Sequence, residues 1–242
     1  MSGFIESTIG VLFIGLLLGL KHAIEADHVA AVSTIVTERK SILSSAIVGG
    51  IWGLGHTISL LAAGLFVLFL DIQISERTER ILEFCVGLML LFLGFNVLQK
   101  IIRGGTVHLH THEHGRHEHA HPHIHEDNHV GEDSHTHHGF SLSPRPLIIG
   151  MIHGLAGSAA LMLLVIPTIH SRTVGLLYIT IFGLGSIVGM MLMSFIVSLP
   201  LHLTATRFKE INLLLRCAAG FTSVGLGLLI IYEKAFSEGL FS

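Results

Sequence analysis

The sequence predicts an all-α polytopic membrane protein, and three observations support this fold class. Half of the 242 residues are hydrophobic and only 13% are charged, whereas a soluble domain carries about a quarter charged residues. The mean hydropathy is +0.71. The charges are clustered and leave apolar stretches of about 18 residues or more, which is the length that crosses a bilayer as a helix. We therefore expect a helical bundle in the lipid bilayer and no basic surface for nucleic acid.

Six apolar segments are long enough to be membrane spans. They cover residues 4–36, 42–70, 81–102, 147–170, 173–200 and 211–233. The first is too long for one plain crossing, so it either tilts or breaks near the polar residues 21–28. The N-terminus lacks the positively charged leader and the small-residue cleavage site of a secretory signal. We therefore expect the first apolar segment to be retained as a span.

The two halves of the chain resemble each other. GLGHTISLL at 53–61 is similar to GLGSIVGMM at 183–191, an offset of 130, and His22 corresponds to His153 at an offset of 131. Glycines in the third and sixth spans correspond at an offset of 133: Gly87, Gly94, Gly220 and Gly227. Because three spans is an odd number, the halves must have opposite orientations, as in many secondary transporters. We predict two inverted three-helix repeats, over 1–103 and 147–242.

A histidine-rich segment, residues 104–146, separates the two repeats. Its thirteen histidines are His108, His110, His112, His114, His117, His119, His121, His123, His125, His129, His135, His137 and His138. No apolar pattern recurs there, so we expect a disordered loop. Neutral imidazole is a ligand for nickel, cobalt, zinc and copper. The loop should therefore bind such ions weakly and exchange them quickly.

Positive charges in the loops predict the orientation of the chain. Nine lie on the side of the histidine-rich loop: Arg39, Lys40, Lys100, Arg103, Arg116, Arg145, Arg207, Lys209 and Arg216. Four lie on the other side: Arg77, Arg80, Arg172 and Lys234. Because cytoplasmic loops carry the excess of lysine and arginine, we expect both termini outside and the loop in the cytosol. The plasma (cell inner) membrane is the expected location.

Four ionisable side chains fall within the first span: His22, Glu25, Asp27 and His28. Such groups are costly inside a bilayer and normally face a cavity or a partner. On a regular helix, at about 100° per residue, His22, Glu25 and His28 share one stripe and Asp27 points away. An unwound turn would instead add Asp27 or backbone carbonyls. Imidazole with carboxylate suits borderline divalent ions, so we expect a metal site here, with Asp27 as a ligand or as a supporting residue.

Two further histidines lie in apolar segments and are candidate ligands. His56 follows glycine in the second span, and His153 is the repeat mate of His22. A single buried histidine is more often a structural hydrogen-bonding residue, but the first motif makes a ligand role the better interpretation for both. Ser186 stands where the second repeat would have a counterpart of His56, and no acid follows His153. The site is therefore expected to draw mainly on the first half.

Residues 19–32, GLKHAIEADHVAAV, resemble the His-x4-Asp-His signature of the nickel/cobalt transporter family. GLGHT at 53–57 and HGLAGS at 153–158 resemble stretches of its short six-span, UreH-like members. The resemblance implies ion-specific permeation without ATP hydrolysis, and uptake members of the family supply nickel to urease or hydrogenase. The family's usual first acid is aspartate, and this chain has Glu25. Because of this difference, the choice between nickel and cobalt as the transported ion is left open.

We therefore expect a secondary transporter of nickel or cobalt, carried as substrate and not as a catalytic cofactor, with uptake preferred. The alternatives are an efflux transporter and a membrane-anchored metal sensor or buffer that uses the histidine loop. A zinc protease is disfavoured, because His22 and His28 are six residues apart and the protease motif places its histidines four apart. We expect no enzymatic activity. A metallochaperone is a possible cytosolic partner, and the oligomeric state is left open.

Overall fold

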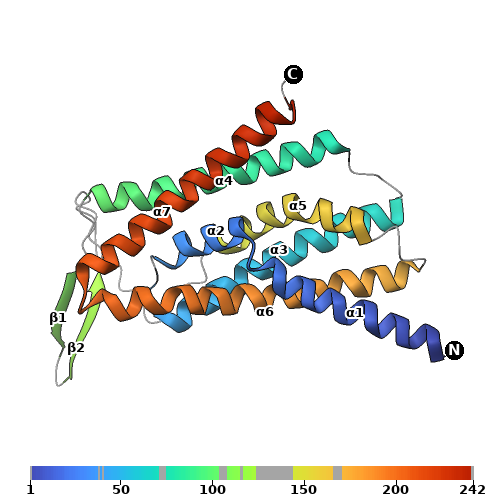
Figure 1. The fold of residues 1–242 in the computed structure, drawn as a ribbon. Coiled ribbons are helices and arrows are strands. Elements are labelled where there is room, and N and C mark those ends of the chain that lie inside the picture. The colour runs from blue at the N-terminus through green and yellow to red at the C-terminus, as the bar shows by residue number, and fades with distance from the viewer. Residues whose placement is uncertain are drawn as a thin grey trace.

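The computed structural model describes residues 2–37, 39, 41–70, 75–103, 108–114, 117–123, 144–165 and 171–240. Side chains are described for 8–37, 39, 41–69, 75–103, 144–156 and 171–240. The helices are α1 (Ser2–His22), α2 (Ala26–Val36), α3 (Ile42–Leu70), α4 (Glu76–Ile102), α5 (Arg145–Val165), α6 (Arg172–Ala205) and α7 (Lys209–Tyr232), and a π-helical turn, η2 (Glu233–Ser237), extends α7. Apart from one hairpin, every regular element described is helical, as the composition predicted (Figure 1).

Four of the described helices are long and apolar enough to cross a membrane: α3, α4, α6, and α7 with its π-helical turn. A fifth span results if α1 and α2 are taken together as one broken helix. The side chains of α5 are described only as far as Ala156, and this part is a shorter apolar helix, Arg145–Ala156. Residues 166–170 of the expected fourth span lie outside the described residues. The chain is therefore an integral membrane protein.

The first apolar segment breaks, which was one of the two outcomes expected from its length. The axes of α1 and α2 differ by 54°. The helix stops at His22, and Glu25 is extended, with φ −61° and ψ 148°, before α2 begins at Ala26. His22, Glu25 and His28 would share one stripe only on a continuous helix. Because the helix breaks between His22 and Ala26, this stripe does not form.

Helices α1, α3, α5 and α6 pack closely, and α3 lies against both α5 and α6 (Figure 1). Glycines permit the short distances. A Cβ atom on Gly19 of α1 would lie 2.1 Å from the carbonyl oxygen of Phe182, and one on Gly150 of α5 would lie 2.0 Å from that of Trp52. Each contact is backbone against backbone, so a larger residue would separate the helices.

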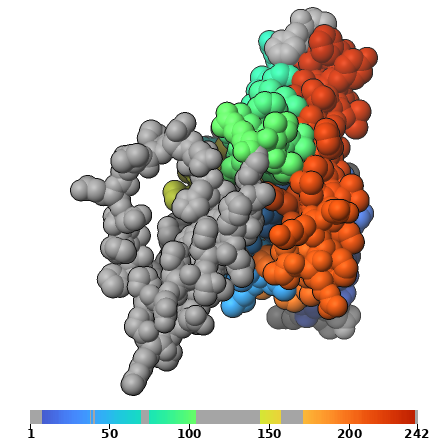
Figure 2. Space-filling view, turned by 90° about the vertical axis from the view of Figure 1, so that its left-hand side faces the viewer, coloured from blue at the N-terminus to red at the C-terminus, as the bar shows by residue number. Residues whose placement is uncertain are grey.

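Helices α4 and α7 form a second pair, and they lie side by side in both views (Figures 1 and 2). Here Gly94 meets the backbone of Gly220, and Gly87 meets that of Gly227. Helix α4 begins at Glu76, earlier than the apolar pattern predicted. The side chain of Ser75 accepts a hydrogen bond from the backbone N–H of Thr78, which is a favourable helix cap that hydropathy does not detect.

The first part of the histidine-rich segment forms an antiparallel hairpin of β1 (His108–His114) and β2 (His117–His123). The backbone of His108 pairs with that of His123, and that of His114 with that of His117. Residues 124–143 lie outside the described residues. The expectation of a disordered, weakly chelating loop therefore stays a prediction.

Candidate metal centre

The break between α1 and α2 brings the two histidines of the polar motif into the interior of the bundle. Two backbone hydrogen bonds close the turn, from Ile24 N to Lys21 O at 2.9 Å and from Glu25 N to His22 O at 3.1 Å. His22 therefore ends one helix and His28 lies in the first turn of the next. Both imidazoles are buried, with 2% and 0% of their surface exposed.

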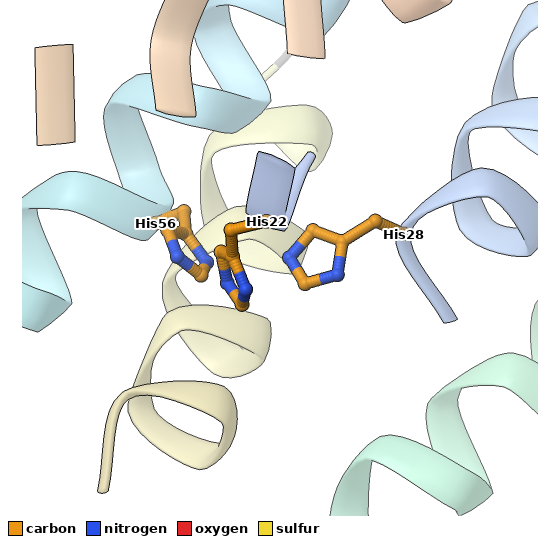
Figure 3. Close-up of side chains that lie close together, drawn as sticks. All are labelled: His22, His28 and His56. Atoms are coloured by element: carbon orange, nitrogen blue, oxygen red, sulfur yellow. The ribbon is translucent and has the colours of Figure 1, made fainter. Parts of the chain in front are cut away.

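Three imidazoles meet at this break, and each comes from a different helix. His56 of α3 joins His22 and His28, and the three residues offer ligand atoms that all lie within 4.8 Å of one another. The ring centroid of His22 lies 4.3 Å from that of His28 and 5.0 Å from that of His56. Figure 3 shows the three side chains directed toward one another. Imidazole binds divalent ions at about 2.0–2.1 Å, so a small contraction would place one ion between them.

A second group shares His28 with the first. Asp27 Oδ1 is 2.9 Å from His28 Nδ1, and Asp27 Oδ2 is 2.9 Å from His153 Nε2. Asp27, His28 and His153 also offer ligand atoms within 4.8 Å of one another. Gly154 allows α5 to approach α3 here, since a Cβ atom on it would lie 2.4 Å from the carbonyl oxygen of His56. The carboxylate of Asp27 therefore links the two halves of the chain.

Unpaired nitrogen atoms are concentrated at this centre. Among the described residues, ten buried side-chain nitrogen or oxygen atoms lack a hydrogen-bond partner, and seven of them lie here. They are His22 Nδ1 and Nε2, His28 Nε2, His56 Nδ1 and Nε2, His153 Nδ1, and Trp52 Nε1. Buried polar atoms without partners are rare in native proteins, and each needs an explanation. A bound cation would satisfy several of these nitrogens at once.

Glu25 lies at the edge of the centre and not within it. Its carboxylate oxygen Oε2 is 2.8 Å from His22 Nδ1, and 49% of its side-chain surface is exposed. The contact is short but is not aligned as a hydrogen bond, since His22 Nδ1 counts among the unpaired atoms. Glu25 does not belong to either group of converging ligand atoms.

Two aromatic residues that the sequence argument did not select form walls of the centre. Trp52 is fully buried and its ring lies 5.4 Å from those of both His28 and His153. The ring of Phe182 lies 5.5 Å from that of His22. Trp52 precedes His56 by four residues on one helix, so the two share a face. This spacing could have indicated from the sequence that Trp52 lies beside the centre, since it is also the single tryptophan of the chain.

All six residues named as candidate ligands are thus near one another, but they divide by position. His22, His28 and His56 form one converging group, and Asp27 and His153 join His28 in the other. Glu25 contacts His22 from the rim.

Comparison with known proteins places the chain in a family. It is 36% identical to urease accessory protein UreH of Bacillus sp. (strain TB-90) over 233 residues, covering 96% of this chain and 95% of that protein. It is also 24% identical over 229 residues to chloroplast protein FOR GROWTH AND FERTILITY 2 of Arabidopsis thaliana, and there the match spans 57% of the relative's length. No family model matches the chain. No solved structure matches it. The chain belongs to the family of urease accessory protein UreH.

Proposed function

We propose that this protein is a secondary transporter that moves a divalent transition-metal ion, nickel or cobalt, through the imidazole centre at the α1–α2 break. The observation that carries the proposal is the convergence of three buried imidazoles inside a bundle of apolar helices, each with at least one unpaired nitrogen: His22, His28 and His56. Imidazole sites suit nickel, cobalt and zinc better than magnesium or calcium. The relationship to a urease accessory protein supports nickel, because the family resemblance implies that uptake members supply nickel to urease.

The proposed architecture is six spans in two inverted repeats, with the metal centre between them. Contacts in the two halves support it, because they occur in matched pairs. Gly19 meets the Phe182 carbonyl, and Gly150 meets the Trp52 carbonyl. Gly150 lies 131 positions after Gly19, and Trp52 lies 130 positions before Phe182. A pseudo-twofold relation between the halves would generate such a pairing.

A second matched set extends this argument. Gly55 meets the carbonyl of Leu147, and Gly185 meets the carbonyl of Leu16. The offsets are again 130 and 131. In the α4–α7 pair, the contact between Gly87 and Gly227 corresponds to that between Gly220 and Gly94 at an offset of 133. Chance resemblance of glycine-rich helices would not pair both partners of each contact.

The proposal includes uptake into the cytosol across the plasma membrane, with both termini outside and the histidine-rich loop inside. The ion is the substrate, and no catalytic step or resident cofactor is required. The loop would receive imported ions and present them to a cytosolic metallochaperone. Metal accumulation by intact cells that express the protein distinguishes the directions, since uptake raises the cellular nickel content and efflux lowers it.

The proposed site is tested by measuring the flux of nickel and of cobalt into liposomes that contain the purified protein, with and without a pH gradient. We expect His22→Ala, His28→Ala and His56→Ala each to abolish metal flux, because each removes one of three ligands. His202→Ala is the matched control. This histidine also lies in an apolar helix, but its Nδ1 donates to the Ser198 carbonyl, so its loss should leave flux unchanged. Full flux in His22→Ala or His28→Ala would refute the proposed site.

A further inference from the structure

We propose that Glu25 and Asp27 are positioning residues and not ligands, so that imidazole nitrogens alone bind the ion at this centre. The inference rests on the proposed function and specifies the ligand set of the same site. It follows from which nitrogen of each histidine is in contact with an acid.

Each acid lies close to Nδ1 of a histidine, but only the contact of Asp27 is a hydrogen bond. Glu25 Oε2 lies 2.8 Å from His22 Nδ1, and Asp27 Oδ1 lies 2.9 Å from His28 Nδ1. In both pairs the histidine is buried and the acid is more exposed, with 49% of the Glu25 side chain and 25% of the Asp27 side chain accessible. Each carboxylate is thus more exposed than the imidazole that it contacts, and Asp27 Oδ2 also contacts the buried His153. In metal sites of proteins, a carboxylate on the second nitrogen fixes the ring orientation and the tautomer.

The contacts of Asp27 determine the tautomer of His28. An ionised carboxylate only accepts hydrogen bonds. Asp27 Oδ1 accepts from the backbone N–H and from Nδ1 of His28, and Oδ2 accepts from Nε2 of His153. Because a neutral imidazole carries one proton, the proton of His28 is on Nδ1 and its lone pair is on Nε2.

The unpaired nitrogens agree with this assignment. His28 Nε2, both nitrogens of His22 and both nitrogens of His56 are buried without a hydrogen-bond partner. Each of the three imidazoles therefore has a free nitrogen for the ion, whereas both oxygens of Asp27 already accept hydrogen bonds. Asp27 Oδ1 accepts two hydrogen bonds and Oδ2 accepts one, so Asp27 offers fewer unused lone pairs to an ion than the three imidazoles do.

Two consequences follow for selectivity and for Glu25. A centre of neutral imidazoles excludes magnesium and calcium, which prefer oxygen ligands. Glu25 contacts His22, three residues earlier, across the broken turn. Compared with the aspartate that is usual in the family, its additional methylene group therefore affects the orientation of His22 and not the identity of the ligands.

The test uses cobalt(II) bound to the full-length chain, with the thirteen loop histidines replaced by serine so that the loop does not contribute. The d–d absorption spectrum and X-ray absorption report the ligands directly. We expect Asp27→Asn to keep the spectrum and the number of imidazole ligands, because its amide oxygen can still accept from His28 Nδ1. The dissociation constant should rise about 10–100-fold, as for other supporting residues of metal sites. We expect the same for Glu25→Gln. His28→Ala should change the spectrum.

Loss of an oxygen ligand or a changed band position in Asp27→Asn or Glu25→Gln would overturn the inference. If the parent chain still transports cobalt in that case, the proposed function stands. A parent chain that binds no cobalt would overturn both. An unchanged melting temperature in each variant excludes misfolding as the cause of a spectral change. Asp27→Ala adds a second comparison, since we expect it to weaken binding more than Asp27→Asn while the ligand set is kept.

Discussion

At the scale of single residues, buried hydroxyl groups connect the helices next to the metal centre. Thr57, which follows His56, directs its hydroxyl at the carbonyl of Gly53 in its own helix, 2.8 Å away, and at that of Gly183 in α6, 3.1 Å away. Ser59 does the same toward α5, with its hydroxyl 2.7 Å from the Met151 carbonyl. These bonds hold α3 in position against both neighbours, so they hold the His56 ring in position as well.

We predict that Thr57→Val lowers the free energy of unfolding in detergent by about 0.5–1.5 kcal/mol. The change keeps the shape of the side chain but removes the donor to the Gly183 carbonyl, and a net hydrogen bond contributes about that much. Thr180→Val is the control, because the Thr180 hydroxyl bonds only to the Leu176 carbonyl of its own helix. An equal loss in both variants would show that the interhelical bond contributes nothing.

At the scale of helices, close backbone contact decides where the ligands meet. α5 contacts α3 through Gly150 and Gly154, which lie on either side of His153. The approach at Gly154 brings the α5 backbone to His56. The glycines weaken the helices they belong to, by about 0.5–1 kcal/mol each relative to alanine in water, but close helix packing in lipid offsets this cost.

Gly150→Ala should destabilise the protein by about 1–3 kcal/mol, the usual range for overpacking a filled interior. The added methyl group would lie 2.0 Å from the Trp52 carbonyl oxygen, so α3 and α5 must separate. Gly225→Ala in α7 is the matched control, because no atom lies within 4 Å of the added Cβ atom. Thermal unfolding in detergent should show a lower melting temperature for the first variant and an equal or higher one for the second. Equal behaviour of the two would contradict the contact.

At the scale of the whole molecule, the candidate metal centre and the histidine-rich segment belong to different parts of the chain. The centre consists of residues from α1, α2, α3 and α5, whereas the histidine-rich segment follows α4 in the chain. Among the residues whose side chains the structure describes, the five that converge there are His22, Asp27, His28, His56 and His153. Transport through the helices should therefore not depend on the loop histidines, whereas a sensor or buffer that uses the loop would require them.

Replacing all thirteen loop histidines by serine, with the chain length kept, should leave metal flux into liposomes within about twofold of the unaltered protein. The physical reason is that the three converging imidazoles remain in place, and only weak sites are removed. Equilibrium dialysis should show fewer bound ions per chain in the same variant. Loss of flux with the helical fold intact would favour a role for the loop in the transport step.

Sequence reasoning was sufficient for the class of protein, and it selected histidines that the structure brings together. Apolar stretches predicted membrane helices, and the length of the first stretch predicted either a tilted span or a break near residues 21–28. It was insufficient for the arrangement of Glu25 and Asp27. The angles of a regular helix put Glu25 beside His22 and His28 and turned Asp27 away, and the break at Glu25 changed both positions.

Hydropathy, charge and spacing are local properties, so the sequence by itself determined that the chain is helical, lies in a membrane and has histidine and carboxylate in its first span. Only the tertiary structure decided which histidines converge and which nitrogen each acid contacts. The contacts of His56 with His22 and of Asp27 with His153 join residues far apart in the chain. They depend on glycine contacts between helices, and no pattern within one segment encodes the geometry of its neighbour.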